Sequence, residues 1–258
     1  MVSLEQVKAL KGGKKIIMLT AYDYQMARIL GSLHVDMLLV GDSLGVVVQG
    51  NASTKKVSMD AMLYHTEIVI RGSRGVPVIA DMPIHSYETP RAALSNALRF
   101  MEIGSSGVKF EGAFPDTAKE LVSAGVPVMA HLGLLPQTAA QYHVVGKDQA
   151  DAAAMIAQAQ ELEKAGAFSI VLECVPESLA KAITETIGIP TIGIGAGKYC
   201  DGQVLVINDL LGLDRGETHP PKFRKQYAEI GNTIATAVAS FIEEVQDGKY
   251  PDAAHTYH

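Results

Sequence analysis

The chain has 258 residues, of which 48% are hydrophobic and 19% are charged, and its formal net charge at pH 7 is −6. This length fits one α/β barrel of about 250 residues, so we expect residues 1–258 to form a single domain. The acidic balance disfavours nucleic acid as a partner, because proteins that bind nucleic acid usually carry a basic patch.

The sequence carries no pattern typical of export or of membrane insertion. The N-terminal stretch MVSLEQVKALKGGKK lacks the apolar core of a signal peptide. No apolar run approaches the roughly 20 residues of a membrane helix. Only two cysteines occur, Cys174 and Cys200, which argues against a disulfide scaffold. We therefore expect a soluble, cytoplasmic protein without a membrane partner.

Eight short apolar runs predict strands, because buried strands of a parallel sheet read as continuous apolar segments. They lie at about 15–19, 36–40, 77–81, 107–111, 126–130, 168–173, 190–194 and 203–207. Helical patterns separate most of them and are expected to start near Asp23, Ser58, Thr89, Phe114, Asp148 and Val175. A last helix is expected from about 222 to 245.

Eightfold alternation of strand and helix is typical of a (β/α)8 barrel. A doubly wound open sheet is the alternative, but no G-x-G-x-x-G motif follows the first strand. The segment between the seventh and eighth strands is too short for a full helix and reads as a turn. Segments 51–57 and 134–147 are expected to be irregular loops, and long loops at the mouth of a barrel usually handle substrate.

Polar and charged residues follow the apolar runs where the strands end. In a barrel these ends converge on one mouth, which is where the fold keeps its chemistry. The mouth is therefore expected to collect Asp42, Ser43, Asp81, Lys109, Glu111, His131 and Glu173. A charge at such a buried position is costly unless it is paired or binds a metal.

Asp42 and Asp81 end successive strands and predict a site for a hard cation. Mg2+ fits, because it usually takes one or two carboxylates and completes its shell with water and substrate oxygens. Manganese and cobalt stay open, since oxygen sites accept several metals. The alternative is that each aspartate caps the following loop or pairs with a lysine.

The remaining mouth residues suit the binding and deprotonation of a small acid. Lys109 and Glu111 lie two positions apart, so they share one face of a strand; they can form a structural ion pair, or Lys109 can hold a substrate carboxylate. His131 is either a hydrogen-bonded structural residue or a substrate contact. Glu173 ends the most apolar of the predicted strands. Burial raises the pKa of a carboxyl group, which makes its ionised form a better general base.

These residue types together suit enolisation. A divalent metal can chelate a 2-oxo acid through its keto and carboxylate oxygens and stabilise the enolate charge. A carboxylate removes the proton on C3, and the enolate attacks an electrophilic carbon.

The chain also resembles the ketopantoate hydroxymethyltransferase (3-methyl-2-oxobutanoate hydroxymethyltransferase) family. The matching stretches, in chain order, are Thr20–Tyr24, Val40–Gly45, Val48–Gly50, Tyr64–Thr66, Val108–Gly112, His131–Leu134, Leu172–Pro176, Ile192–Gly197, Asp201–Gln203 and Pro221–Phe223. They cover nearly the whole chain in order, so the resemblance is more specific than any single motif.

The resemblance implies a (β/α)8 barrel that transfers a hydroxymethyl group from 5,10-methylenetetrahydrofolate to 3-methyl-2-oxobutanoate. The product would be 2-dehydropantoate, in pantothenate biosynthesis. By this resemblance Asp42 and Asp81 bind magnesium, and Glu111 is a further metal ligand or holds a water. Ser43 and Lys109 bind the keto acid, His131 lies beside the substrate, and Glu173 is the catalytic base. The resemblance also implies a homo-oligomer, commonly a decamer.

One segment departs from the family pattern. The loop after His131-Leu132-Gly133 is shorter than usual, Leu135 replaces the usual threonine, and the loop ends in His143-Val144-Val145-Gly146. This loop is expected to close over the mouth, so the departure bears on lid closure and on folate docking.

Two other functions stay open. Lyases and mutases of the phosphoenolpyruvate mutase and isocitrate lyase kind use a similar barrel and metal, but their Lys-Lys-Cys-Gly-His loop has no counterpart here. A barrel retained as a binding or scaffold protein is the other alternative, although every expected site residue is present.

Overall fold

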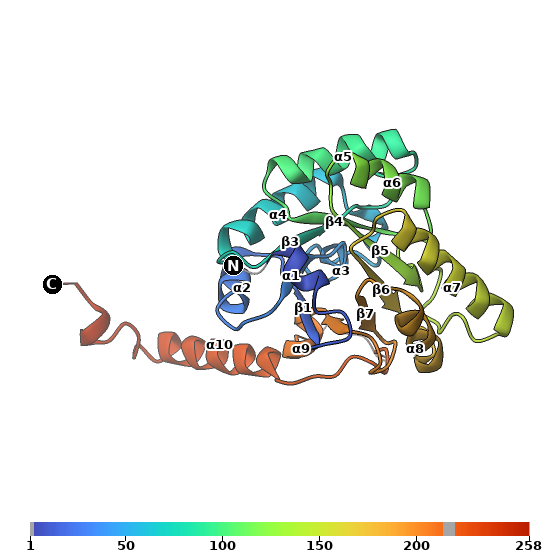
Figure 1. Cartoon of the computed structure of the whole chain (residues 1–258). Helices are drawn as coiled ribbons and strands as arrows, with labels where there is room; N and C mark the ends of the chain where they lie inside the picture. The colour runs from blue at the N-terminus through green and yellow to red at the C-terminus, as the bar shows by residue number, and fades with distance from the viewer. Residues whose placement is uncertain (1–2, 214–219, 258) are drawn as a thin grey trace. The chain divides into compact units, whose positions relative to one another are not determined.

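A computed structural model of the chain describes residues 3–213 and 220–257. The chain divides into two compact units, Met1–Val206 and Ile207–His258. The first unit is a closed barrel of eight parallel strands that neighbour one another in chain order (Figure 1). The strands are β1 (Ile16–Thr20), β2 (Met37–Val40), β3 (Val78–Asp81), β4 (Gly107–Glu111), β5 (Val128–Gly133), β6 (Ser169–Glu173), β7 (Thr191–Ile194) and β8 (Gly202–Leu205). The predicted barrel is confirmed, and closure excludes the open doubly wound sheet.

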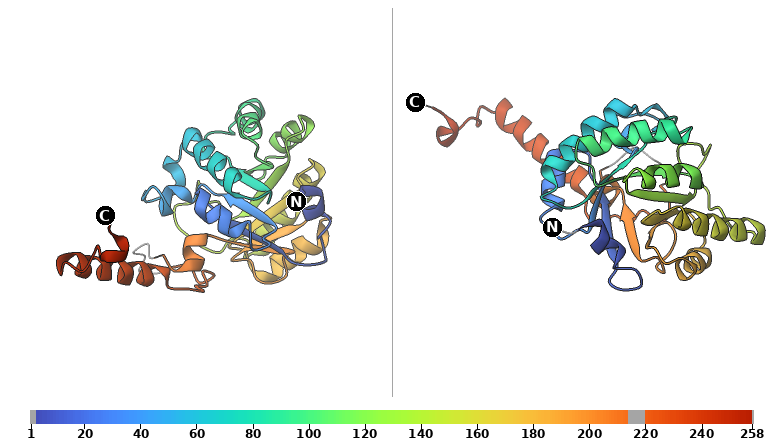
Figure 2. Two further views of the ribbon diagram at one scale, coloured as in Figure 1. Left: turned by 90° about the vertical axis from the view of Figure 1, so that its left-hand side faces the viewer. Right: turned by 45° about the horizontal axis from the view of Figure 1, so that its top comes forward.

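Helices cover the outside of the strands in the first unit, as the two views of Figure 2 show. The helices of this unit are α1 (Leu4–Lys8), α2 (Tyr24–Leu30), α3 (Leu44–Val47), α4 (Met59–Gly72), α5 (Pro90–Glu102), α6 (Pro115–Ser123), α7 (Gln149–Lys164) and α8 (Glu177–Thr186). A short 3-10 helix, η1 (Thr54–Lys56), lies inside the loop predicted at 51–57. Residues 195–201 between β7 and β8 are described throughout and form no helix, as expected.

The predicted helix starts are set by capping side chains. Ser58 accepts a hydrogen bond from the third residue of α4, and Thr89 does the same for α5, where Pro90 takes the first helical position. Asp148 caps α7 in the same way. Each cap satisfies a backbone N–H that has no partner inside its helix.

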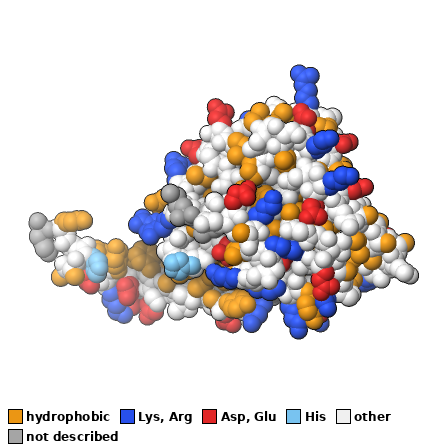
Figure 3. All heavy atoms as spheres, in the orientation of Figure 1, with side chains coloured by type: hydrophobic (Ala, Val, Ile, Leu, Met, Phe, Trp, Pro, Cys, Tyr) orange, Lys and Arg blue, Asp and Glu red, His pale blue; other side chains and the backbone are white. Residues whose placement is uncertain are grey.

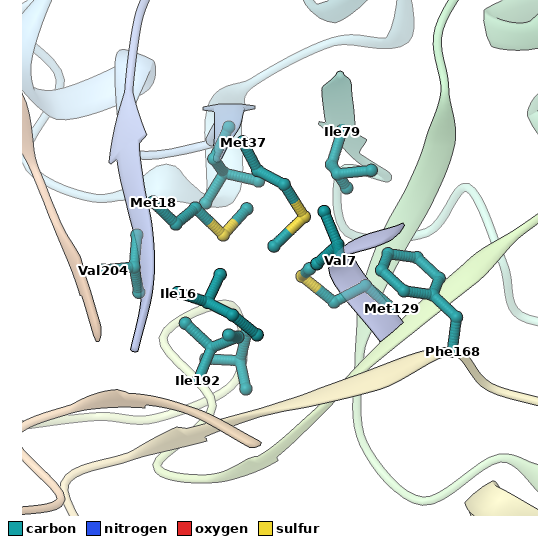
Figure 4. Packing of buried hydrophobic residues seen from close by; sticks show 11 residues of the cluster. Val7, Ile16, Met18, Met37, Ile79, Met129, Phe168, Ile192 and Val204 are labelled. Carbon is teal, nitrogen blue, oxygen red and sulfur yellow. The ribbon is translucent and has the colours of Figure 1, made fainter. Parts of the chain in front are cut away.

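A cluster of apolar side chains fills the end of the barrel opposite the mouth (Figure 4). Its members are Val7, Ile16, Met18, Met37, Leu39, Ile79, Met129, Phe168, Val171, Ile192 and Val204. Val7 belongs to α1 and is fully buried among strand residues, so this helix covers the end of the barrel opposite the mouth. The packed cluster makes this end of the barrel a core, which leaves the other end for chemistry.

The inward face of the strands changes from apolar to charged along their length. Side chains two positions apart share one face of a strand. On β3 the cluster residue Ile79 is followed on that face by Asp81, and on β5 Met129 is followed by His131. The strands therefore carry the core and the charged mouth on a single face, one after the other.

Most strand limits lie within one residue of those expected, whereas both ends of β5 and the C-terminal end of β8 differ by more. β5 continues to Gly133, because residues 131–133 stay in register with β6, where Gly133 lies opposite Glu173. β8 ends at Leu205 instead of 207, because Ile207 begins the short helix α9 (Ile207–Leu211). Loop 134–147 contains no helix or strand, as predicted.

The second unit holds α9, α10 (Ile230–Gln246) and the 3-10 helix η2 (Ala253–His255). The helix expected from 222 begins only at Ile230, so its predicted start was wrong. The reason is that residues 222–229 bond to α9: the N–H of Tyr227 donates to the carbonyl of Leu210 at 2.8 Å, and Arg224 Nε lies 3.1 Å from Asp209 Oδ2. A single domain over 1–258 stays a prediction.

On the face drawn in Figure 3, acidic and basic side chains of the barrel unit are interspersed. None of the described helices is long and apolar enough to cross a membrane.

Candidate active site

β3 and β4 place three charged side chains next to one another at the mouth. Asp81 ends β3 in register with Lys109 of β4, and Glu111 lies two positions further along the inward face of β4. The ammonium of Lys109 donates a hydrogen bond to Asp81 Oδ1, and both side chains are buried. Lys109 thus pairs with Asp81, which is one of the alternatives that the sequence leaves open.

β5 and β6 bring His131 and Glu173 to the same mouth. His131 is in register with Glu111 of the neighbouring strand, and its Nδ1 lies 3.9 Å from Glu111 Oε1. Its Nε2 lies 3.4 Å from Oε2 of Glu173, the last residue of β6. The imidazole therefore lies between two carboxylates.

The turn after β2 adds Asp42 and Ser43. The backbone N–H of Asp42 donates to Asp81 Oδ2 at 3.1 Å. A Cβ at Gly41 would lie 2.7 Å from Ser43 Oγ, so a larger residue at this position would displace the Ser43 hydroxyl. The structure therefore brings Asp42, Ser43 and Asp81 together, as the sequence predicts.

Gln137 is a buried residue of the mouth that the sequence reasoning missed. Its Nε2 donates to Asp42 Oδ2 at 2.9 Å and to the carbonyl of Met82 at 3.0 Å. Its Oε1 accepts a hydrogen bond from the hydroxyl of Tyr87, and its backbone N–H donates to Glu111 Oε2 at 3.0 Å. The only signal in the sequence is that Gln137 lies in the loop expected to handle substrate.

Tyr22 is a second missed residue and supports Ser43. Its hydroxyl and that of Ser43 lie 2.8 Å apart and share a hydrogen bond. The carbonyl of Tyr22 lies 2.6 Å from Nδ1 of His65 on α4. These contacts fix the position of the Ser43 hydroxyl at the rim of the site.

Negative charge exceeds positive charge at the mouth. Burial, followed by the charge of Asp81, raises the pKa of Asp42 to about 7, and the charge of Glu173 contributes in the same direction. Burial, followed by the charge of Asp42, raises the pKa of Glu111 to about 9. These carboxylates are therefore close enough to oppose each other's ionisation.

The pKa values of the two basic side chains at the mouth, Lys109 and His131, shift in opposite directions. Burial disfavours the charged form of Lys109, but Asp81, Glu111 and Asp42 outweigh it and raise the pKa of this ammonium. Burial, followed by the charge of Lys109, lowers the pKa of His131 well below its ordinary value. Near neutral pH the mouth therefore holds one cationic lysine and a neutral imidazole.

The donor set fits a hard divalent cation. Asp42 and Asp81 are buried neighbours whose charges act on each other, and a cation beside them would offset the negative charge. Within residues 3–213 and 220–257, no three His, Cys, Asp or Glu side chains form a ready-made metal cluster. Two carboxylates with water and substrate oxygens are the usual provision for Mg2+.

An α/β barrel whose mouth gathers buried carboxylates, a lysine and a histidine defines an enzyme that acts on a small molecule at the C-terminal ends of its strands. Residues 1–253 match the model of the ketopantoate hydroxymethyltransferase family. The chain belongs to this family.

Two relatives support the assignment. The 3-methyl-2-oxobutanoate hydroxymethyltransferase of Syntrophus aciditrophicus (strain SB) is 50% identical over 254 residues, which cover 96% of this chain and 93% of the relative. The protein of the same name from Heliobacterium modesticaldum (strain ATCC 51547 / Ice1) is 48% identical over 265 residues, which cover 99% of this chain and 95% of the relative. Similarity thus extends over nearly the whole length of both relatives.

Solved structures with the same fold are more distant in sequence. Phosphonopyruvate hydrolase in complex with oxalate and Mg++ aligns with a TM-score of 0.66 at 12% identity, covering 99% of this chain and 93% of that one. A 2,3-dimethylmalate lyase of the PEP mutase/isocitrate lyase superfamily aligns with a TM-score of 0.61 at 15% identity, covering 100% and 93%. At this identity the likeness shows a shared fold alone.

Proposed function

We propose that this enzyme transfers a hydroxymethyl group from 5,10-methylenetetrahydrofolate to 3-methyl-2-oxobutanoate, with Mg2+ as its metal. Membership of the family assigns the hydroxymethyl transfer and a place in pantothenate synthesis. The folate, the metal and the role of each residue belong to the proposal. The observation that carries it is the convergence of Asp42, Asp81 and Glu173 at one mouth, where their charges act on one another.

Asp42 and Asp81 would hold the metal, with Glu111 as a further ligand or as the holder of a metal-bound water. Support comes from the adjacency of the two aspartates and from the excess of buried negative charge that a cation would balance. When bound, Mg2+ supplies Lewis-acid stabilisation of the negative charge that develops on the keto oxygen during enolisation.

Ser43, Lys109 and His131 would bind the keto acid together with the metal. Lys109 is the one cationic group among these site residues and can face a substrate carboxylate while it stays paired with Asp81. Neither ring nitrogen of His131 makes a well-aligned hydrogen bond within the described part of the chain, although the ring is buried and contacts the backbone of Leu134. A buried polar group whose hydrogen bonds are incomplete indicates a place where a ligand supplies one.

Glu173 would act as the base that removes the proton on C3 of the keto acid. It ends an apolar strand and is buried beside the neutral imidazole of His131, which adds no competing positive charge. The electron pair left on C3 then bonds to the one-carbon unit of the folate. Overall, water supplies the hydroxyl oxygen, tetrahydrofolate leaves, and C3 gains a CH2OH group.

Turnover of 3-methyl-2-oxobutanoate tests this function. Product should form only when methylenetetrahydrofolate is present, and a metal chelator should abolish it until Mg2+ is restored. Cleavage of the keto acid, or product formed equally well without folate, would contradict the proposal. We also propose a homo-oligomer, with a decamer as the family resemblance implies, which light scattering of the purified protein tests. A cytoplasmic location stays a prediction.

A further inference from the structure

Gln137 is the most buried side chain of the loop between β5 and α7. Only 1% of its surface is exposed, whereas the next residue, Thr138, is exposed to solvent. The backbone N–H groups of Thr138 and Ala139 both donate to the carbonyl of Leu135, which forms a tight turn around this position. The turn directs Gln137 into the mouth of the barrel while its neighbours stay outside.

The partners of Gln137 fix the orientation of its side-chain amide. Two acceptors, Asp42 Oδ2 and the carbonyl of Met82, face Nε2, and one donor, the hydroxyl of Tyr87, faces Oε1. A reversed amide would turn Oε1 toward two other acceptors, which is unfavourable. The amide can therefore hold one oxygen of the Asp42 carboxylate in a single position.

The same residue holds a second carboxylate through its backbone. The N–H of Gln137 donates to Glu111 Oε2 at 3.0 Å. Asp42 lies in the turn after β2 and Glu111 ends β4, and their charges repel each other, so a donor between them opposes their separation. Gln137 thus contacts two of the three carboxylates to which the proposed function assigns metal-side roles.

We propose that Gln137 is a positioning residue that engages Oδ2 of Asp42 and leaves Oδ1 directed at the cation, so that the loop after β5 controls the affinity of the metal site. The inference rests on the proposed function in one respect, namely that the cation binds at Asp42. Residues that orient metal ligands typically change metal affinity or activity by about 10- to 100-fold when they are replaced.

The test measures the affinity of the purified full-length protein for Mn2+, followed by the electron paramagnetic resonance signal of the free ion. Gln137→Met keeps the length of the side chain and the backbone N–H but removes both donors to Asp42 and Met82. We expect its dissociation constant for Mn2+ to rise by about 10- to 100-fold. Gln137→Asn keeps an amide one methylene shorter and should restore part of the loss.

Matched variants separate this role from a merely structural one. Thr138→Ala changes the same turn at an exposed side chain and should bind Mn2+ as the wild type does. Asp42→Asn should lose Mn2+ affinity if the proposed function is right. Wild-type affinity in Gln137→Met, together with a loss in Asp42→Asn, would overturn the inference and leave the proposed function standing.

The other outcomes are also decisive. If Asp42→Asn binds Mn2+ as tightly as the wild type, the cation does not use Asp42, and the proposed metal site fails together with the inference. If Gln137→Met does not fold, Gln137→Leu, which also removes the side-chain amide, carries the test, and wild-type Mn2+ affinity in that variant contradicts the positioning role.

Discussion

Nε2 of His131 lies 3.4 Å from Oε2 of Glu173, and both side chains are buried at the mouth of the barrel. The imidazole is neutral, because burial, followed by the charge of Lys109, lowers its pKa. A neutral neighbour adds no positive charge beside Glu173. In the proposed function this pair would combine a proton acceptor with a hydrogen-bonding group for the substrate.

Glu173→Gln should abolish deuterium exchange at C3 of 3-methyl-2-oxobutanoate while it leaves metal binding intact. The amide has almost the same shape but cannot accept the proton, and loss of a general base lowers a rate by about 10²- to 10⁴-fold. Proton NMR in D2O measures the exchange, and Mn2+ titration of the same variant is the control. Exchange at the wild-type rate would refute the assignment of the base.

Lys109→Met should destabilise the fold in the absence of metal. Removal of the ammonium leaves Asp81 buried without its ion-pair partner, and breaking a buried pair in this way costs about 3–5 kcal/mol. Urea unfolding measures the difference in free energy. Added Mg2+ should recover part of the loss, because a ligand that binds only the folded state stabilises it.

Lys119→Met is the matched control for this variant. Lys119 is exposed on α6, so its replacement should change the free energy of unfolding by no more than about 0.5 kcal/mol. Equal stability of the two variants would show that the Lys109–Asp81 pair contributes nothing to folding.

Most of the site could be predicted because the barrel imposes its geometry on the sequence. Asp81, Glu111 and Glu173 each end a strand, and the ends of parallel strands in a barrel meet at one mouth. The periodicity of two residues also places Lys109 on the same face as Glu111. These relationships depend only on secondary structure and fold class, which the apolar runs indicate.

Contacts made by loops and by the C-terminal segment could not be predicted in this way. Gln137 lies four residues beyond the end of β5, and its burial depends on a turn that no local pattern specifies. Residues 222–229 have helix-forming composition, but Tyr227 bonds to the carbonyl of Leu210 instead of to its own segment. In both cases a long-range partner overrides the local preference.

Gly133→Ala should disturb both the fold and the base. Gly133 has a φ of +101°, a backbone conformation that residues other than glycine rarely adopt. A Cβ at this position would lie 2.2 Å from the carbonyl oxygen of Glu173. The clash involves backbone, so β5 and β6 must separate at the mouth. We expect a loss of about 1–3 kcal/mol in stability from the strained backbone alone.

Exchange at C3 should also fall in this variant, because Glu173 moves with its strand. Gly125→Ala is the control, since Gly125 likewise has a positive φ, +83°, but a Cβ there meets nothing within 4 Å. Gly125→Ala should lower the free energy of unfolding through its strained backbone, but it should leave deuterium exchange at C3 unchanged. Wild-type exchange in Gly133→Ala would show that the close approach to Glu173 is not needed for catalysis.

Asp201→Asn should weaken the fold in a way that depends on pH. Asp201 lies just before β8 and accepts hydrogen bonds from the backbone N–H groups of Thr191 and Gly12 and from the ammonium of Lys11. Burial alone favours the neutral acid, but these donors hold the pKa of Asp201 below its ordinary value. At pH 7 we expect the variant to be about 1.5–3 kcal/mol less stable, the range for hydrogen bonds to a charged group.

The pH dependence follows from the direction of that shift. Because the folded pKa lies below the unfolded one, the ionised carboxylate stabilises the fold above about pH 4, and this contribution is lost as the pH falls through the folded value. Urea unfolding between pH 7 and pH 3 should therefore show that the difference in the free energy of unfolding between wild type and Asp201→Asn becomes smaller on acidification. Asp42 and Glu111, whose pKa values are raised, affect both proteins alike and cancel in the difference. A gap that stays constant or widens toward low pH would mean that Asp201 supports β8 through its shape and not through its charge.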